Sequence, residues 1–128
     1  AGRMTRWFGE YLREKGVPNG RERNLKFLLA HPESGSACKR FCMFLRWMGR
    51  RDELDPGDWI SHGLSTADLV LPLDTHLLRI SKSLGLTQSK QATWKAAIEA
   101  TEALAYWDPS DPLRFDFALC RLGMLGGR

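Results

Sequence analysis

Apolar residues recur every three or four positions along most of this chain, and no segment alternates apolar and polar residues with a period of two. Spacing of three to four places side chains on one face of an α-helix, whereas half-buried strands need the period of two. The spacing therefore predicts an all-α fold of about six helices. The 128 residues are 43% hydrophobic, and no repeat or linker divides them, so we expect residues 1–128 to form a single helical domain.

Turn and capping residues separate the segments with helical spacing. Asp74 or Thr75 is expected to cap the N-terminus of the fourth helix, and Gly85 to follow its C-terminus. Asp111 is expected to cap the last helix, with Pro112 in its first turn. The expected helices cover residues 4–12, 23–30, 37–49, 74–84 and 92–106, and the segment after Asp111-Pro112 that buries Phe115, Leu119 and Leu122.

The third of these segments, residues 37–49, is apolar almost all round, which predicts a central and largely buried helix. Its polar stripe is narrow and consists of cations. Lys39, Arg46 and Arg50 follow one another at intervals of seven and four residues, so they share one side of the helix. The simplest interpretation of Lys39 is a solubilising residue on this stripe.

Three cysteines are present, which is an odd number, and this favours a reducing cytoplasm over a secreted disulfide framework. Cys38 and Cys42 are one helical turn apart without a second pair, so we expect them and Cys120 to be buried thiols, with no metal and no cofactor. The sequence contains no apolar run of the roughly 18 residues that span a bilayer, and its first residues, AGRMTR, lack the apolar core that a signal peptide would be expected to have. We therefore expect no membrane partner.

The formal net charge of +4 favours a polyanionic partner only weakly, because nineteen basic residues stand against fifteen acidic ones. Four arginines lie close together in the sequence and are candidate contacts to DNA phosphates. Trp59, in a polar segment, is a candidate aromatic contact to a nucleic acid. The four candidate arginines are Arg40, Arg46, Arg50 and Arg51.

The sharpest local pattern is LPLDTHLLRI at residues 71–80, in which an acidic residue stands at the expected start of a helix. Capping alone can explain Asp74, because an aspartate accepts hydrogen bonds from the first-turn amides and is favoured by the positive end of the helix dipole. In that interpretation His76 is a surface or capping residue.

The same segment resembles the catalytic-aspartate segment of helix-hairpin-helix DNA glycosylases, particularly the endonuclease III branch, where an Asp-Thr-His triplet begins a helix. Upstream, GSACK at residues 35–39 has the Gly-x-x-x-Lys spacing of the segment that carries the nucleophilic lysine in bifunctional members. The long separation of Lys39 and Asp74 is similar to that of archaeal 8-oxoguanine glycosylases. Across residues 33–124 the chain also resembles an uncharacterised bacterial and archaeal family described as a domain of unknown function.

The resemblance implies that Lys39 attacks C1′ of a nucleotide to give a Schiff base, while Asp74 stabilises the positive charge that develops on the sugar. His76 and Arg79 would support this pair. The lysine must be neutral to attack, and we expect burial in the apolar helix and cationic neighbours such as Arg40 to favour that form. Both catalytic residues are expected to line a common cleft.

The implied partner is double-stranded DNA with a damaged base that is flipped into a pocket. Glycosylases of this superfamily form the pocket between two helical lobes, and this chain corresponds to the lobe that carries both catalytic residues, so we expect it to belong to a larger two-lobed protein. The chain departs from the superfamily in two ways. The DNA-binding hairpin of the superfamily usually reads Gly-x-Gly before the lysine, whereas here Ala37 stands at the second glycine position. The chain also lacks the iron-sulfur cysteines of endonuclease III.

Three functions follow from these patterns. The leading hypothesis is a base-excision repair glycosylase that can also act as a lyase on abasic sites. The second is a nucleic-acid-binding helical module without catalysis, for which the arginines would suffice. The third is a helical protein-interaction domain with no role in nucleic-acid binding.

Overall fold

The computed structural model describes residues 10, 14 and 30–125. This part of the chain contains four α-helices and no strand, apart from two isolated β-bridges, and so confirms the all-α prediction. The first two expected helices, at 4–12 and 23–30, fall almost entirely outside the described residues. The helices are α3 (Lys39–Gly49), α4 (Thr75–Ser83), α5 (Trp94–Ala105) and α6 (Asp116–Leu125). Four short 3-10 turns accompany them: η1 (Pro32–Ser34) before α3, η2 (Ile60–His62) and η3 (Thr66–Asp68) between α3 and α4, and η4 (Pro112–Phe115) before α6.

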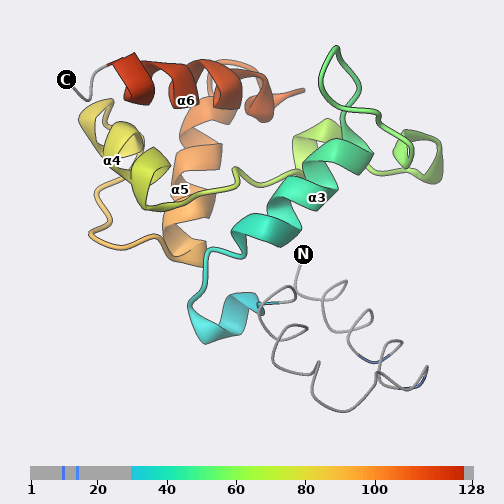
Figure 1. The fold of residues 1–128 in the computed structure, drawn as a ribbon, viewed down its shortest axis with the longest axis horizontal. Helices are drawn as coiled ribbons and strands as arrows, with labels where there is room; N and C mark the ends of the chain where they lie inside the picture. Colours follow the sequence, from blue (N-terminus) through green and yellow to red (C-terminus); the bar gives the residue numbers. More distant parts are fainter. Residues whose placement is uncertain (1–9, 11–13, 15–29, 126–128) are drawn as a thin grey trace.

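An extended segment, residues 69–73, runs between α3 and the group formed by α4, α5 and α6 (Figure 1). Its leucines contribute to both halves of the core. Leu69 packs into the cluster beneath α3, and Leu71 and Leu73 pack into the cluster formed by α4, α5 and α6. All three are almost fully buried. This segment therefore fixes the place where α4 begins.

The ends of α4 are formed as the sequence predicted. Asp74 is the N-cap, and its carboxylate accepts the backbone N–H of Leu77 at 2.7 Å. Gly85 follows the last turn with a φ of 75°, a left-handed conformation that glycine adopts without steric cost, and its N–H bonds to the carbonyl of Lys82. At the far side of α4, Gly123 of α6 lies so close to His76 and Ile80 that a Cβ there would clash with both.

Two predictions about burial were wrong. Only one face of α3 is buried, and Phe44 and Trp47 are 40% and 45% exposed, because the described neighbours of α3 pack along one side of it. Leu122 is also exposed, on α6. The buried residues of α3 are Phe41, Cys42, Leu45, Arg46 and Gly49.

Asp111 is the N-cap residue of η4 and Pro112 lies in its first turn, as predicted. The Asp111 side chain makes no capping hydrogen bond, however, because Arg50 binds the carboxylate. The final α-helix begins only at Asp116, after the 3-10 turn. None of the helices described is long and apolar enough to cross a bilayer.

Candidate functional site

Lys39 and Asp74, 35 residues apart in the sequence, are in direct contact. Lys39 is the first residue of α3 and Asp74 is the N-cap of α4, so the contact joins the N-terminal ends of two helices. The Nζ atom lies 2.5 Å from Oδ2. The side chains are 46% and 36% exposed, respectively, so the burial expected for Lys39 is not observed and its amine faces solvent.

The turn before α3 places Lys39 through an unusual backbone conformation at Cys38. Its φ of 51° and ψ of 34° are left-handed, and among the described residues it is the sole non-glycine with a positive φ. This conformation costs a residue with a Cβ about 1–2 kcal/mol, and such strain concentrates at functional sites. Local hydrogen bonds hold it, because the Cys38 N–H donates to Ser36 Oγ at 3.2 Å and the thiol donates to the Ala30 carbonyl at 3.0 Å.

The carboxylate of Asp74 uses its two oxygens differently. Oδ1 accepts the N–H of Leu77, while Oδ2 binds the ammonium of Lys39. Partial burial raises the pKa of Asp74, but these donors outweigh it and hold the pKa below the ordinary value. Asp74 is therefore ionised at neutral pH, and the capping bond fixes its orientation.

Two cysteines close to Lys39 are not competing nucleophiles. Burial raises the pKa of the Cys38 thiol, and burial raises the pKa of the Cys42 thiol to about 12, so both are protonated at neutral pH. Both are buried as predicted, while Cys120 is half-buried and donates to Asp116. Within residues 30–125 and at the two described positions before them, no cluster of histidines, cysteines and acids could hold a metal ion.

His76 and Arg79 lie in the first turns of α4, close to Asp74 in the sequence. Their side chains face each other, with Arg79 Nη2 3.4 Å from His76 Nδ1. The other edge of the imidazole faces Gly123 on α6. Their contacts are thus with each other and with α6, and a supporting role toward Lys39 stays a proposal.

Arg46 lies inside the protein and not on a DNA-facing surface. It is 7% exposed, its Nε donates to Asp55 Oδ2 at 3.1 Å, and its Nη1 binds Asp116. Burial raises the pKa of Asp116, while the guanidinium of Arg46 opposes that shift. This side chain has no free donor surface to offer a phosphate.

Arg50 belongs to the same network. Its Nε donates to both oxygens of Asp111, at 3.1 and 3.0 Å, and its Nη1 binds Asp52 and Asp55. The expectation that Arg46 and Arg50 contact DNA therefore does not fit their positions, because carboxylates from the loop directly after α3 and from the distant segment 111–116 bind them. Arginines within an otherwise apolar helix were a signal that buried carboxylates face them. The other two candidates, Arg40 and Arg51, are exposed.

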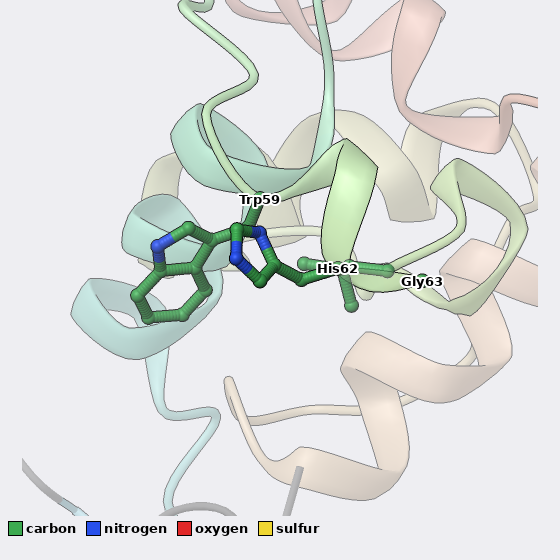
Figure 2. Close-up of a pocket in the computed structure, with 4 residues that line it drawn as sticks. Trp59, His62 and Gly63 are labelled. Atoms are coloured by element: carbon green, nitrogen blue, oxygen red, sulfur yellow. The ribbon is translucent and has the colours of Figure 1, made fainter.

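The polar segment around Trp59 suggested an aromatic side chain that is free to contact a nucleic acid. In the structure Trp59 is only partly accessible. Its ring packs edge-on against Phe44 of α3, with centroids 5.2 Å apart. Figure 2 shows Trp59 and His62 projecting from the turn around η2, where they line a pocket together with Gly63 and Leu64. Trp59 therefore anchors this loop to α3.

The model of one protein family, described as a protein of unknown function (DUF2400), matches residues 3–125. The chain belongs to this DUF2400 family. The match covers Lys39 and Asp74, so both residues lie within the DUF2400 domain, to which no activity is attached. Searches of curated proteins and of solved structures gave no significant match.

Proposed function

We propose that this DUF2400 chain is a DNA glycosylase-like protein of base-excision repair, in which Lys39 is the nucleophile and Asp74 its acidic partner. One observation carries the proposal: the Lys39 amine lies 2.5 Å from the Asp74 carboxylate and both are accessible from solvent. A lysine paired with an oriented carboxylate matches what Schiff-base chemistry at a sugar requires. The motifs that resemble the glycosylases contain these two residues.

The chemistry assigns a separate task to each group. The Lys39 ammonium first releases a proton to water, which frees the nitrogen lone pair and leaves the Asp74 carboxylate ionised. The Nζ–C1′ bond then forms as the bond between C1′ and the damaged base breaks, and the base leaves with the bonding electrons and takes up a proton. A proton then moves from Nζ to the ring oxygen O4′ as the C1′–O4′ bond breaks, which opens the sugar and gives a protonated Schiff base between Lys39 and C1′.

The position of Asp74 suits it to the cationic stage of this reaction. Its Oδ1 is held by the Leu77 N–H, so the carboxylate keeps its orientation when Lys39 turns toward a sugar. A fixed negative charge stabilises a developing positive charge without reorganising at the moment of reaction. Arg40 and Arg51 remain in the proposal as contacts to the phosphate backbone, since both are exposed.

Borohydride trapping tests the proposal directly. The 128-residue chain is incubated with duplexes that carry an abasic site or one of several oxidised bases, and borohydride then reduces the Schiff base to a stable amine linkage. We expect a covalent adduct with the wild type and none with Lys39→Arg, which keeps the cation beside Asp74 but cannot form the Schiff base. Lys95→Gln, an exposed lysine at the start of α5, should trap as well as the wild type. Equal trapping by Lys39→Arg would reassign the nucleophile.

A second candidate is a DNA-binding module without catalysis. The observation that favours it is the ion pair itself, because a half-exposed lysine next to an N-cap aspartate also occurs where it only links two helices. In this case the wild type binds DNA but gives no adduct with any duplex, and Lys39→Arg binds as well as the wild type.

The third candidate is a helical protein-interaction domain. It is favoured by the large apolar side chains that α6 leaves exposed, Phe117, Leu122, Met124 and Leu125. A chain of this kind would show no salt-dependent binding to DNA, which a titration of fluorescent duplex at two salt concentrations would establish.

A further inference from the structure

An open groove lies between α4 and the segment that links α4 to α5. One wall is the face of α4 that carries Thr75, Arg79 and Lys82, and the other contains Lys90 and Gln91. Leu78 and Ala92 form the apolar part of its floor. Figure 1 shows the link running below α4, from the end of that helix to the start of α5. No acidic residue lines the groove.

The sequence contains two long stretches that carry cations but no acidic residue, residues 34–51 and 75–98. In the folded protein they differ in how many of their cations are bound by carboxylates. In the first, carboxylates from other segments bind three cations, among them the Lys39 amine. In the second, no carboxylate of residues 30–125 lies within ion-pairing distance of Arg79, Lys82 or Lys90. All three are exposed. A groove whose cations lack internal counterions attracts a polyanion.

The groove lies next to the candidate site along the chain. Its lining includes Thr75, which directly follows Asp74, whose carboxylate binds Lys39. Thr75 and Lys82 are seven residues apart on one face of α4, which corresponds to a length of about 10 Å at 1.5 Å per residue. A DNA strand places one phosphate about every 3.4 Å along the helix axis, so the groove can hold roughly two or three consecutive phosphates.

We propose that the groove formed by Arg79, Lys82 and Lys90 binds the phosphate backbone of the DNA strand beside the nucleotide that reacts with Lys39. This inference rests on the proposed glycosylase-like function and extends it, because it assigns the backbone contacts to α4 and its link to α5. It also gives Arg79 a defined role, as a phosphate ligand. Backbone contacts of this kind position the strand and carry no sequence preference.

The test is the salt dependence of DNA binding, measured by fluorescence anisotropy with a duplex that carries one abasic site. We compare the wild-type chain with Lys82→Gln/Lys90→Gln. The matched control is Lys95→Gln/Arg121→Gln, which removes two exposed cations outside the groove. Each phosphate contact contributes about 0.9 to the slope of log K against log salt concentration, so the groove variant should lose about 1.8 of slope and the control almost none.

The outcomes separate this inference from the proposed function. A groove variant that keeps the wild-type slope, or a control that loses as much slope, overturns the groove assignment even if borohydride trapping succeeds. Absence of salt-dependent DNA binding by the wild type overturns it as well. Tighter binding to an RNA duplex of the same length would reassign the groove to RNA. Loss of slope in the groove variant without trapping by the wild type supports the groove and contradicts the glycosylase.

Discussion

The hydroxyl of Thr101, on α5, accepts the backbone N–H of Leu71 at 2.9 Å. The same hydroxyl donates to the carbonyl of Ala97 at 2.6 Å, one turn earlier in the helix. Both residues are buried, so the bond fixes the extended segment to α5 three residues before Asp74. The position of the carboxylate beside Lys39 thus depends on a hydroxyl in the core.

Thr101→Val replaces this hydroxyl by a methyl group and leaves the Leu71 N–H buried without a partner. We expect the free energy of unfolding to fall by about 1–3 kcal/mol. Urea denaturation monitored by tryptophan fluorescence measures the change. Thr101→Ser keeps the hydroxyl and is the control; a Thr101→Val protein as stable as the wild type would contradict a stabilising role of this hydrogen bond.

Removal of the Arg46 guanidinium should destabilise the protein much more than removal of a surface arginine. Arg46→Met leaves the buried carboxylate of Asp116 without its cation, and breaking a buried pair in this way costs about 3–5 kcal/mol. Arg51→Met, at an exposed position, should change the free energy of unfolding by no more than about 0.5 kcal/mol. Adding Asp116→Asn to Arg46→Met should recover part of the loss. Similar thermal midpoints for Arg46→Met and Arg51→Met would contradict a stabilising network.

The contribution of Asp74 to stability should depend on pH. Its pKa is lower in the folded protein than the ordinary value of 3.8, so its ionised form stabilises the fold above that pH, and this contribution is lost as the pH falls through the folded pKa. Asp74→Asn keeps a capping side chain but removes the charge. The wild type should therefore be more stable than Asp74→Asn at pH 7, and the difference should shrink below pH 3.8. A difference that grows on acidification would contradict this prediction.

Lys39→Gln should abolish the reaction with DNA while leaving the stability of the protein almost unchanged. The Lys39–Asp74 ion pair is half-exposed, and pairs of this type contribute about 0–1 kcal/mol. We expect a thermal midpoint within a few degrees of the wild type, together with complete loss of the borohydride adduct. If Lys39→Gln unfolds the chain, the ion pair is a structural link between α3 and α4, and the catalytic interpretation loses its main argument.

The sequence predicted the positions of the helices better than the tertiary contacts of their side chains. Helical spacing located α4 and α5 to within about two residues, and the capping preferences of Asp74 and Gly85 were sufficient to find both ends of α4. Periodicity tells which residues share a face but not what lies opposite them. It therefore grouped Lys39 and Arg46 on one stripe without revealing that one is exposed and the other buried.

The absence of a capping hydrogen bond from the Asp111 side chain has the same origin. An aspartate before a proline is a strong local signal for a helix cap, yet a guanidinium 61 residues away binds its carboxylate. Local preferences cannot include a competitor that only the tertiary fold supplies. The left-handed backbone of Cys38 also lacked a signal, because the expected residues for that conformation are glycine and asparagine.

The network around Arg46 and Arg50 has a consequence for the kinetics of folding. Arg46 and Asp116 are 70 residues apart, and Arg50 and Asp111 are 61 apart, so each contact closes a long loop of chain. The entropic cost of closing such loops is met only after more local contacts have formed. We therefore expect the network to form after the transition state for folding. Substitutions within it should accelerate unfolding while leaving the rate of folding almost unchanged, so these arginines determine how long a folded molecule survives.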